Sequence, residues 1–488
     1  MNYKLIGNIL GKVLLAEGGL LVLPLIAALC FGESVLPFVI PMIPIFIIGA
    51  VLARIKPASE NLFAKEGFVC VGLSWILMSL FGALPFVISG DIPDYLNALF
   101  ETVSGFTTTG ASILANPEVL SRGCMFWRLF THWIGGMGVL VFIAAILPVS
   151  GAHYIHIMRA EVPGPTVSKI MPRVRQTARI LYLIYPALTL LECVFLLFGG
   201  MSFYDAILHS FATGGTGGFS TQAASIAGFD SVYIEMVISV FMLLFGCNFN
   251  LFYLIIIGQG LQALKSEEFR IYIGIVISSV ILIAVNIASM AGSFVTGLRY
   301  SFFQVASIIT TTGFSSCDFD RWPEFSRWIL VLLMFIGGCA GSTAGGLKIS
   351  RIIIMIKSYI AELKRLVLPS RVVTVRLEKK PVEIEKMRGI HVFFATYMAI
   401  TAVGILILSL NGMDMVTNIT ASVACISNVG PGLSGVGPTC SYFLFSPLSK
   451  TTLIAEMLLG RLEIFPLLLC FPRPSGKRNK RLNVISGS

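Results

Sequence analysis

Apolar runs of about 20 residues recur along the whole of this 488-residue chain, and a helix of that length crosses a hydrocarbon core roughly 30 Å thick. Only 12% of the residues are charged, whereas 56% are hydrophobic. A soluble domain of this length would need far more polar surface to cover its core. The sequence therefore predicts an all-α polytopic membrane protein.

The first two apolar runs, at 10–31 and 35–52, follow one another with almost no gap. No small-residue cleavage site ends the first run, so we interpret it as a retained helix and not as a signal peptide. Residues 1–66 then form a unit of two N-terminal transmembrane helices.

The ten cysteines are scattered along the chain, without a C-x-x-C pair or a spacing to histidine that is typical of metal sites. Free cysteines usually serve as small apolar side chains in or near helices. The sequence therefore predicts neither a metal centre nor a disulfide framework.

The formal net charge of +10 could indicate a nucleic-acid partner, but the distribution of Lys and Arg argues against one. The basic residues cluster in loops between apolar runs, at 54–65, 159–179, 265–270, 351–388 and 473–481. The positive-inside rule places these loops and both termini in the cytoplasm. We interpret the charge as the topology of a multi-pass protein of the cytoplasmic (inner) membrane, with docking of a cytoplasmic partner as a second role.

Beyond residue 66, a pattern occurs four times: a spanning helix, a shorter half-polar segment, a Gly/Thr/Ser stretch and a second spanning helix. The repeats cover 67–150, 151–265, 266–388 and 389–488. Their spanning helices are expected at 68–89 and 124–148, 178–199 and 231–260, 270–291 and 325–360, and 389–410 and 447–470. Such repetition predicts symmetry or pseudosymmetry about an axis, with about ten spanning helices in all.

The shorter segments, at 94–106, 203–213, 297–309 and 414–426, are too short to span the bilayer, so we expect four re-entrant pore helices. The stretches that follow them read TTTGAS at 107–112, GTGGFS at 215–220, TTTGFS at 310–315 and SNVGPG at 427–432. These stretches cannot face lipid, because their N–H and C=O groups would lack partners. They must be buried in protein or line a water-filled cavity.

These constraints favour a cation selectivity filter shared by the four repeats. A short helix whose C-terminal end points inward presents the negative end of its dipole, and extended backbone can offer carbonyls in place of an ion's water shell. The candidate filter residues are Thr108, Thr109, Gly110, Thr216, Gly217, Gly218, Thr311, Thr312, Gly313, Asn428, Val429 and Gly430. The fourth stretch lacks paired hydroxyls, so full fourfold symmetry is not expected. Ordinary Gly/Thr turns are the alternative.

A second candidate element is the stretch GGCAGSTAGG, which interrupts the last helix of the third repeat. Its glycines are Gly337, Gly338, Gly341, Gly345 and Gly346. Each costs up to about 1 kcal/mol of helix propensity, so we expect a broken helix whose loop could plug the pore and move aside. The G-x-x-x-G spacing within the stretch is also typical of close helix packing, and the residues leave both interpretations open.

Arg461 lies in an otherwise apolar helix, where an unpaired charge is costly. It could donate hydrogen bonds to carbonyls of the Gly-rich loop and hold a gate closed. Alternatively, it pairs with Glu456 or Glu463, or extends to the cytoplasmic interface. We interpret Lys348, just after the loop, as a cytoplasmic anchor.

Several further polar residues have weaker signals. Asp94, Asp205 and Asp414 are most simply N-caps of short helices, with attraction of cations to the outer mouth as an added possibility. Glu101 could brace the filter or only bond to a neighbour. His132 receives no role.

Besides the four candidate filter stretches, the chain contains three further motifs: HWIGGMGVLVF at 132–142, GGCAGSTAGGLKISR at 337–351 and MLLGRLEIFP at 457–466. On these motifs the chain resembles the TrkH branch of the Trk/Ktr/HKT potassium transporters over essentially its whole length. The resemblance implies a pseudo-fourfold pore in each subunit of a homodimer in membrane lipid, and uptake of K⁺, with Rb⁺ as a substitute. It also implies a TrkA-like cytoplasmic nucleotide-binding subunit as regulator, and it favours the gate interpretation of the Gly-rich loop and Arg461.

Two other function classes stay as alternatives. Na⁺- or H⁺-coupled potassium symport would also use broken helices. A polytopic membrane enzyme is more remote, because the chain has no D-D-x-x-D, H-E-x-x-H or G-x-S-x-G motif. No organic cofactor is expected, since GPGLSG at 430–435 lacks the strand–helix setting of a dinucleotide site. In the basic loop, RVVTVRLEKKPVEIEK could form a short hairpin outside the membrane, with partner docking as its preferred role.

Overall fold

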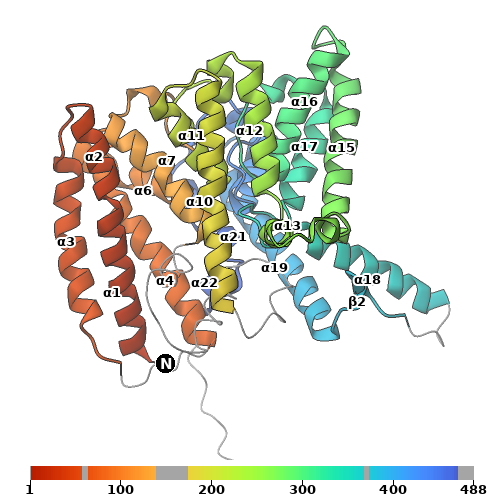
Figure 1. Ribbon diagram of the computed structural model, residues 1–488, viewed down its shortest axis with the longest axis horizontal. Helices are drawn as coiled ribbons and strands as arrows, with labels where there is room; N and C mark the ends of the chain where they lie inside the picture. Colours follow the sequence, from red (N-terminus) through yellow and green to blue (C-terminus); the bar gives the residue numbers. More distant parts are fainter. Residues whose placement is uncertain (1, 58–63, 139–173, 368–372, 471–488) are drawn as a thin grey trace, which may run out of the picture.

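The computed structural model describes residues 2–57, 64–138, 174–367 and 373–470. Within these ranges the fold is a bundle of helices that run side by side, with a small β-hairpin of two strands, each two residues long (Figure 1). The all-α prediction is confirmed. The second half of the predicted helix 124–148 and most of the basic clusters at 159–179 and 473–481 lie outside the described residues.

The two N-terminal apolar runs form a helical hairpin at one edge of the bundle (Figure 1). It consists of α1 (Tyr3–Leu20) with its continuation α2 (Val22–Cys30), and of α3 (Leu36–Ala53). The two arms approach closely at Gly11, where a Cβ atom would lie 2.3 Å from the Ala53 nitrogen. The hairpin therefore depends on a small residue at this crossing.

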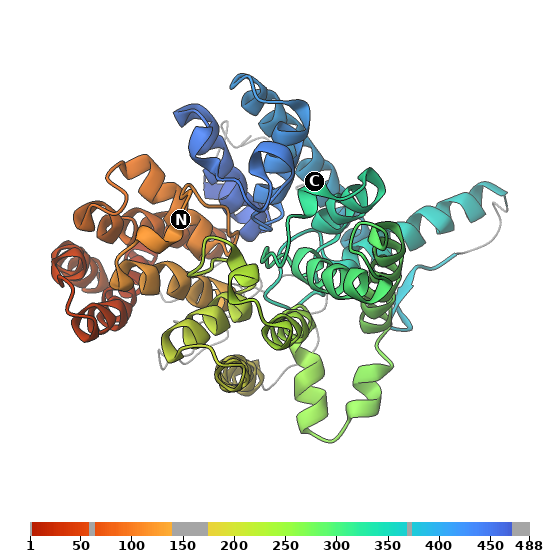
Figure 2. The same cartoon turned by 90° about the horizontal axis from the view of Figure 1, so that it is seen from above.

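Seen from above, the four repeats surround a common centre in chain order (Figure 2). The first repeat contains α4 (Ala64–Gly82), α5 (Leu84–Ser89), α6 (Tyr95–Phe106), η1 (Pro117–Val119) and α7 (Arg122–Met137). The second contains α10 (Val174–Phe198), α11 (Phe203–Gly215), η2 (Ser225–Phe229), α12 (Val232–Phe245), α13 (Phe249–Ile256) and α14 (Gly260–Leu264).

The third repeat contains α15 (Glu267–Ile287), α16 (Phe294–Ile309), η3 (Phe319–Arg321), α17 (Glu324–Ile336) and α18 (Ile349–Val367). The hairpin β1 (Arg376–Leu377) and β2 (Lys380–Pro381) follows and confirms the hairpin predicted in the basic loop. The fourth contains α19 (Ile384–Ser409), α20 (Met415–Ile426), η4 (Ser434–Val436), η5 (Tyr442–Leu444), α21 (Pro447–Arg461) and α22 (Phe465–Cys470).

Each short helix α6, α11, α16 and α20 begins with a side-chain cap. Asp94 accepts from Leu96 N at 3.3 Å and Asp414 accepts from Thr417 N at 3.1 Å, as predicted. The prediction for Asp205 is wrong, because Ser202 precedes it and takes the cap position. The Ser202 hydroxyl accepts from Asp205 N and donates to its carboxylate at 2.7 Å, so the aspartate lies in the first turn.

Five helical segments of the described residues are long and apolar enough to cross a membrane. They are Tyr3–Cys30, Leu36–Ala53, Glu66–Ser89, Glu267–Ile287 and Ile384–Ser409. A sixth candidate span is the bent pair α12 and α13, whose axes differ by 92°.

Two predicted continuous helices are therefore wrong. The helix at 231–260 breaks after Phe245, because Asn248 starts a new helix by accepting from Asn250 N at 3.0 Å. The helix at 447–470 breaks at Glu463 and Ile464, which both have positive φ.

Gly11→Ala should destabilise the protein, because the added methyl group overlaps the backbone of α3. Overpacking of this kind costs about 1–3 kcal/mol. Gly19→Ala on the same helix is the matched control, since a Cβ atom there meets nothing within 4 Å. Thermal unfolding in detergent measures both. Equal unfolding midpoints would contradict the tight crossing.

Candidate functional site

The four Gly/Thr/Ser stretches meet in a closed ring. A Cβ atom built on the aligned glycine of each repeat would lie within 2.6 Å of a backbone carbonyl oxygen in the next repeat. The four facing pairs are Gly110 with the Gly217 carbonyl, Gly218 with that of Thr312, Gly313 with that of Val429, and Gly430 with that of Thr109. The last contact returns to the first repeat, so four separate segments of the chain enclose one centre.

The four stretches share one backbone conformation. The aligned glycines have φ between 73° and 97°, and the residues two positions earlier have φ between 53° and 57°. The earlier residues are Thr108, Thr216, Thr311 and Asn428. A non-glycine residue in this left-handed region costs roughly 1–3 kcal/mol and persists only where the surroundings impose it.

Hydrogen bonds at the end of each short helix impose that conformation. The residue before each aligned glycine donates its N–H to the carbonyl five positions earlier, at 2.8–2.9 Å. The four pairs are Thr109 to Ser104, Gly217 to Ala212, Thr312 to Ser307, and Val429 to Ala424. Together with a second bond from the left-handed residue to the carbonyl three positions earlier, this is a Schellman motif.

One open cavity of about 100 Å³ reaches all four aligned glycines. Its wall is formed by residues that follow them, including Ser112, Ser220, Ser315 and Thr439. Because the glycines come soon after the C-terminal ends of α6, α11, α16 and α20, four negative helix ends converge below the cavity. This setting is suited to a positive ion.

The first and third repeats hold their threonines in the same way. The hydroxyls of Thr107 and Thr109 are 2.8 Å apart, and those of Thr310 and Thr312 are also 2.8 Å apart. In the fourth repeat, Asn428 instead donates its side-chain amide to Thr109 Oγ1 at 2.9 Å. The repeats are therefore alike in backbone and different in side-chain bonding.

His132 of α7 explains why the second repeat has glycines where the others have larger residues. A Cβ atom on Gly217 would lie 1.7 Å from His132 Nδ1, and one on Gly215 would lie 2.2 Å from the His132 carbonyl oxygen. The imidazole also packs on the Phe219 ring, with centroids 4.2 Å apart. The sequence offers no signal for this contact, because His132 belongs to a different repeat.

The Gly-rich stretch forms a non-helical loop between α17 and α18, at 337–348. Gly337, Gly341 and Gly346 have positive φ, and a Cβ atom on Gly345 would lie 2.3 Å from the Ser427 carbonyl oxygen. The predicted interruption of the helix is confirmed. Helix packing through G-x-x-x-G is wrong for this segment, because these glycines lie outside the helices. A Cβ atom on Gly338 would lie 2.7 Å from the Cβ atom of Ala344 in the same loop.

The loop touches two of the Gly/Thr/Ser stretches at residues that precede the aligned glycines. Gly345 N donates to Thr311 Oγ1 at 2.6 Å, and Gly346 N donates to the Ser427 carbonyl at 3.0 Å. The cavity, in contrast, is lined by the glycines, by residues that follow them and by Arg128 of α7. The loop and the cavity therefore contact different ends of the same short stretches.

Arg461 joins this loop to the first repeat. Its Nη1 donates to the Thr343 carbonyl at 2.8 Å, and its Nη2 donates to the Gly135 carbonyl. The two acidic residues considered as its partners have other contacts: Glu463 pairs with Arg351 at 2.7 Å, and Glu456 accepts from Ser422 at 2.6 Å.

Two charged residues near the loop differ from expectation. Lys348 is not a cytoplasmic anchor, because its side chain is 2% exposed and folds back to donate to the Ala344 carbonyl. Glu268 of α15, which the sequence pattern does not single out, accepts from Ala340 N at 2.7 Å and from Ser350 N at 3.2 Å. Both residues hold the loop in its present shape.

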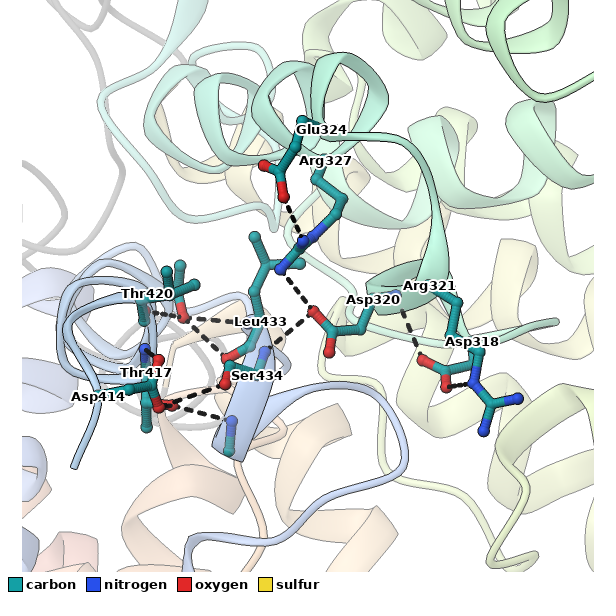
Figure 3. A network of polar contacts seen from close by, with 12 residues as sticks. Asp318, Asp320, Arg321, Glu324, Arg327, Asp414, Thr417, Thr420, Leu433 and Ser434 are labelled. Atoms are coloured by element: carbon teal, nitrogen blue, oxygen red, sulfur yellow. Dashed lines mark hydrogen bonds and ion pairs between the residues drawn. The ribbon is translucent and has the colours of Figure 1, made fainter.

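A polar network on the cavity side links the third and fourth repeats (Figure 3). Asp320 Oδ1 accepts from Arg327 Nη2 at 3.1 Å and from Ser434 N at 3.0 Å. Ser434 also donates to Asp414 at 3.2 Å. Partial burial would raise the pKa of Asp414, but hydrogen bonds from Thr417 and Ser434 outweigh it and lower that pKa. The carboxylate therefore stays ionised at neutral pH.

Comparison with known proteins gives consistent matches over the chain. A family model described as TrkH, cation transport protein, matches residues 37–481. The chain is 37% identical over 479 residues to the Trk system potassium uptake protein TrkH of Salmonella typhimurium strain LT2, which covers 96% of this chain and 99% of that protein.

Two further matches extend this result. The Trk system potassium uptake protein TrkG of Escherichia coli K12 is 34% identical over 459 residues, with 92% of this chain and 93% of that protein covered. The crystal structure of the potassium transporter TrkH from Vibrio parahaemolyticus has a TM-score of 0.87 at 33% identity, and covers 97% of this chain and 99% of that chain.

Gly217→Ala should destabilise the protein because the new methyl group overlaps the His132 imidazole, and His132→Ala in the same chain should restore part of the loss. Since the two positions are in contact, their effects should deviate from additivity by about 0.5–3 kcal/mol. Thermal unfolding of the single and double variants in detergent measures this coupling. Gly274→Ala in α15 is the control, because a Cβ atom there has open space. Strictly additive effects would show that His132 does not require glycine at position 217.

Proposed function

This chain belongs to the TrkH family of cation transport proteins, and on that premise we propose that it takes up potassium through a cation-selective, channel-like pore. The ring of four glycines below one cavity is the observation that carries the proposal. The relatives that cover nearly the whole chain are named as potassium uptake proteins, which supports K⁺ as the transported substrate.

In this proposal, the three-residue segments that end at each aligned glycine form the selectivity filter. Their common left-handed turn and the glycine that follows let backbone carbonyls of four repeats approach one centre. Carbonyl oxygens can replace the hydration shell of a potassium ion, and the negative ends of four short helices stabilise the dehydrated charge. The fold thereby lowers the cost of moving an ion through an apolar layer.

The Gly-rich loop and Arg461 form the gate in this proposal. The role of the loop is supported by its direct contacts with Thr311 of the filter and with Ser427, which precedes the fourth filter segment. Arg461 ties Thr343 of the loop to Gly135 of α7. Hydrogen bonds to a charged donor are worth roughly 1.5–3 kcal/mol each, so this residue favours the closed arrangement.

A TrkA-like cytoplasmic nucleotide-binding subunit would act on this gate from the basic loop at 351–388. The β-hairpin supports a docking role because it is fixed to the membrane helices. Glu378 at its turn accepts from the N–H groups of Glu267 and Glu268, at 2.7 and 3.2 Å, at the start of α15. The carboxylate of Glu268 in turn holds the Gly-rich loop.

The proposed setting is a homodimer in the cytoplasmic (inner) membrane, with both termini in the cytoplasm. Exposed apolar side chains along α3 support contact with membrane lipid, among them Leu36, Ile43 and Val51, which are 55–61% exposed. The basic loops support the orientation, since such loops stay in the cytoplasm.

Cation uptake into proteoliposomes tests the proposed filter. We expect wild-type protein to take up K⁺ and Rb⁺ faster than Na⁺ and Li⁺. Gly313→Ala should reduce this preference about tenfold or more, equivalent to about 1.4 kcal/mol, because the methyl group would meet the Val429 carbonyl and strain a positive φ. Gly292→Ala is the control, since it also has positive φ but open space.

Three results would contradict the proposed pore. Unchanged preference in Gly313→Ala would remove the filter assignment, and equal K⁺ and Na⁺ uptake by wild-type protein would remove selectivity. Uptake that requires an imposed Na⁺ or H⁺ gradient would favour coupled symport instead.

Arg461→Ala should raise K⁺ uptake in the absence of any regulatory subunit by about tenfold or more, since it removes charge-assisted hydrogen bonds to the loop. Arg388→Ala, an exposed arginine in the first turns of α19, is the matched control and should leave uptake unchanged. Uptake of the two variants is compared in the same proteoliposome assay. Equal uptake would argue against a role of Arg461 in keeping the gate closed.

A further inference from the structure

A buried ion pair lies beside the first filter segment. Arg128 Nε of α7 is 2.6 Å from Glu101 Oε1 of α6, and the side chains are 3% and 0% exposed. Taking two charges out of water is costly unless geometry and further hydrogen bonds compensate. The contacts around this pair therefore indicate what it holds in place.

Glu101 binds the part of the first repeat that follows Gly110. Its Oε1 accepts from Ser112 Oγ at 2.9 Å, and its Oε2 accepts from Ile113 N at 2.9 Å. Arg128 shares this anchor, because its Nη2 donates to Ser112 Oγ at 3.1 Å. The pair thus fixes both a side chain and the backbone immediately after the filter glycine.

Arg128 also crosses to the second repeat. Its Nη1 donates to the Ser220 carbonyl at 3.2 Å, and its guanidinium carbon lies 3.6 Å from the centroid of the Phe219 ring. Phe219 and Ser220 directly follow Gly218, and Arg128 lines the cavity above the glycines. One guanidinium group therefore holds the residues that directly follow the filter segments of two repeats.

The aligned positions of the other repeats differ in chemistry. Nine residues before the aligned glycine, the chain has Glu101, His209, Gln304 and Ala421. His209 Nε2 is 3.0 Å from Ser220 Oγ, so the second repeat connects its short helix to the stretch after the glycine through an imidazole ring. In the fourth, Thr420 Oγ1 accepts from Leu433 N at 3.0 Å. The first repeat instead places a charge at this position, and Arg128 extends it to the next repeat.

We propose that Glu101 and Arg128 are positioning residues that fix the first two filter segments relative to each other and thereby set the preference among cations. This inference rests on the proposed function of the glycine ring as a filter. The carboxylate also neutralises the guanidinium charge in the cavity wall, which would otherwise repel an approaching cation. The pair acts through the backbone at Ile113 and Ser220 and does not itself need to touch the ion.

Arg128→Lys separates the geometry of the pair from its charge. Lysine retains the positive charge beside Glu101, but its single nitrogen cannot replace the three nitrogens that contact Glu101, Ser112 and Ser220. We expect the K⁺/Na⁺ uptake ratio in proteoliposomes to fall by about fivefold, since charge-assisted bonds of fixed geometry are among the strongest in proteins.

Arg327→Lys is the matched control. Arg327 is also ion-paired, and it links the third and fourth repeats on the cavity side through Asp320 and Ser434 (Figure 3). Its ion pairs are with Asp320 and Glu324, and not with the segments of the first and second repeats that Arg128 holds. It should leave the K⁺/Na⁺ ratio unchanged. Unfolding midpoints are measured for both variants, so a change of ratio can be compared at similar stability.

Each outcome decides the proposal. A ratio that falls in Arg128→Lys and stays constant in Arg327→Lys supports it, whereas an unchanged ratio in folded Arg128→Lys overturns it. If Arg128→Lys does not fold, Ser112→Ala removes the hydroxyl shared by the pair, and a ratio equal to wild type then overturns the proposal. Wild-type protein without K⁺ selectivity would overturn the proposed function and with it this inference, a result distinct from selective wild type with unaffected variants.

Discussion

Backbone N–H and C=O groups inside a membrane protein must find partners within the protein, and the centre of this molecule depends on how that demand is met. Each short helix ends in the same Schellman turn, in which the residue before the aligned glycine donates to the carbonyl five positions earlier. The turn uses the N–H groups of the stretch and leaves several of its carbonyls beside the neighbouring repeat. The left-handed φ of Thr108, Thr216, Thr311 and Asn428 is the cost of this arrangement.

Different side chains stabilise this common backbone in the four repeats. A pair of threonine hydroxyls does so in the first and third repeats, and the amide of Asn428 does so in the fourth. In the second, His132 of the first repeat fills the space above two glycines. The symmetry of the centre is therefore a symmetry of backbone. The side-chain contacts behind that backbone differ from one repeat to the next.

Local spacing was enough to predict the features that depend on neighbours in sequence. The four short helices, the caps at Asp94 and Asp414, and the break at 337–348 are of this kind. The misassigned cap at Asp205 is a local error, since Ser202 precedes it by three residues. The inward-folded Lys348 and the contact of His132 depend on residues far away in the chain, and a single sequence has no periodicity that reports them.

The Gly-rich loop has partners on both of its sides, and this arrangement limits how it can move. Toward the centre the loop bonds to Thr311 and Ser427. Toward α15, the N–H of Ala340 in the loop and the N–H of Ser350 at the start of α18 both donate to Glu268. Glu268 lies in the first turn of α15, and the N–H groups of that turn bond to Glu378 of the β-hairpin. The hairpin, the first turn of α15 and the Gly-rich loop are therefore connected by hydrogen bonds in series. The same loop is bonded to Thr311 and Ser427, so its position and that of the glycine ring share these contacts.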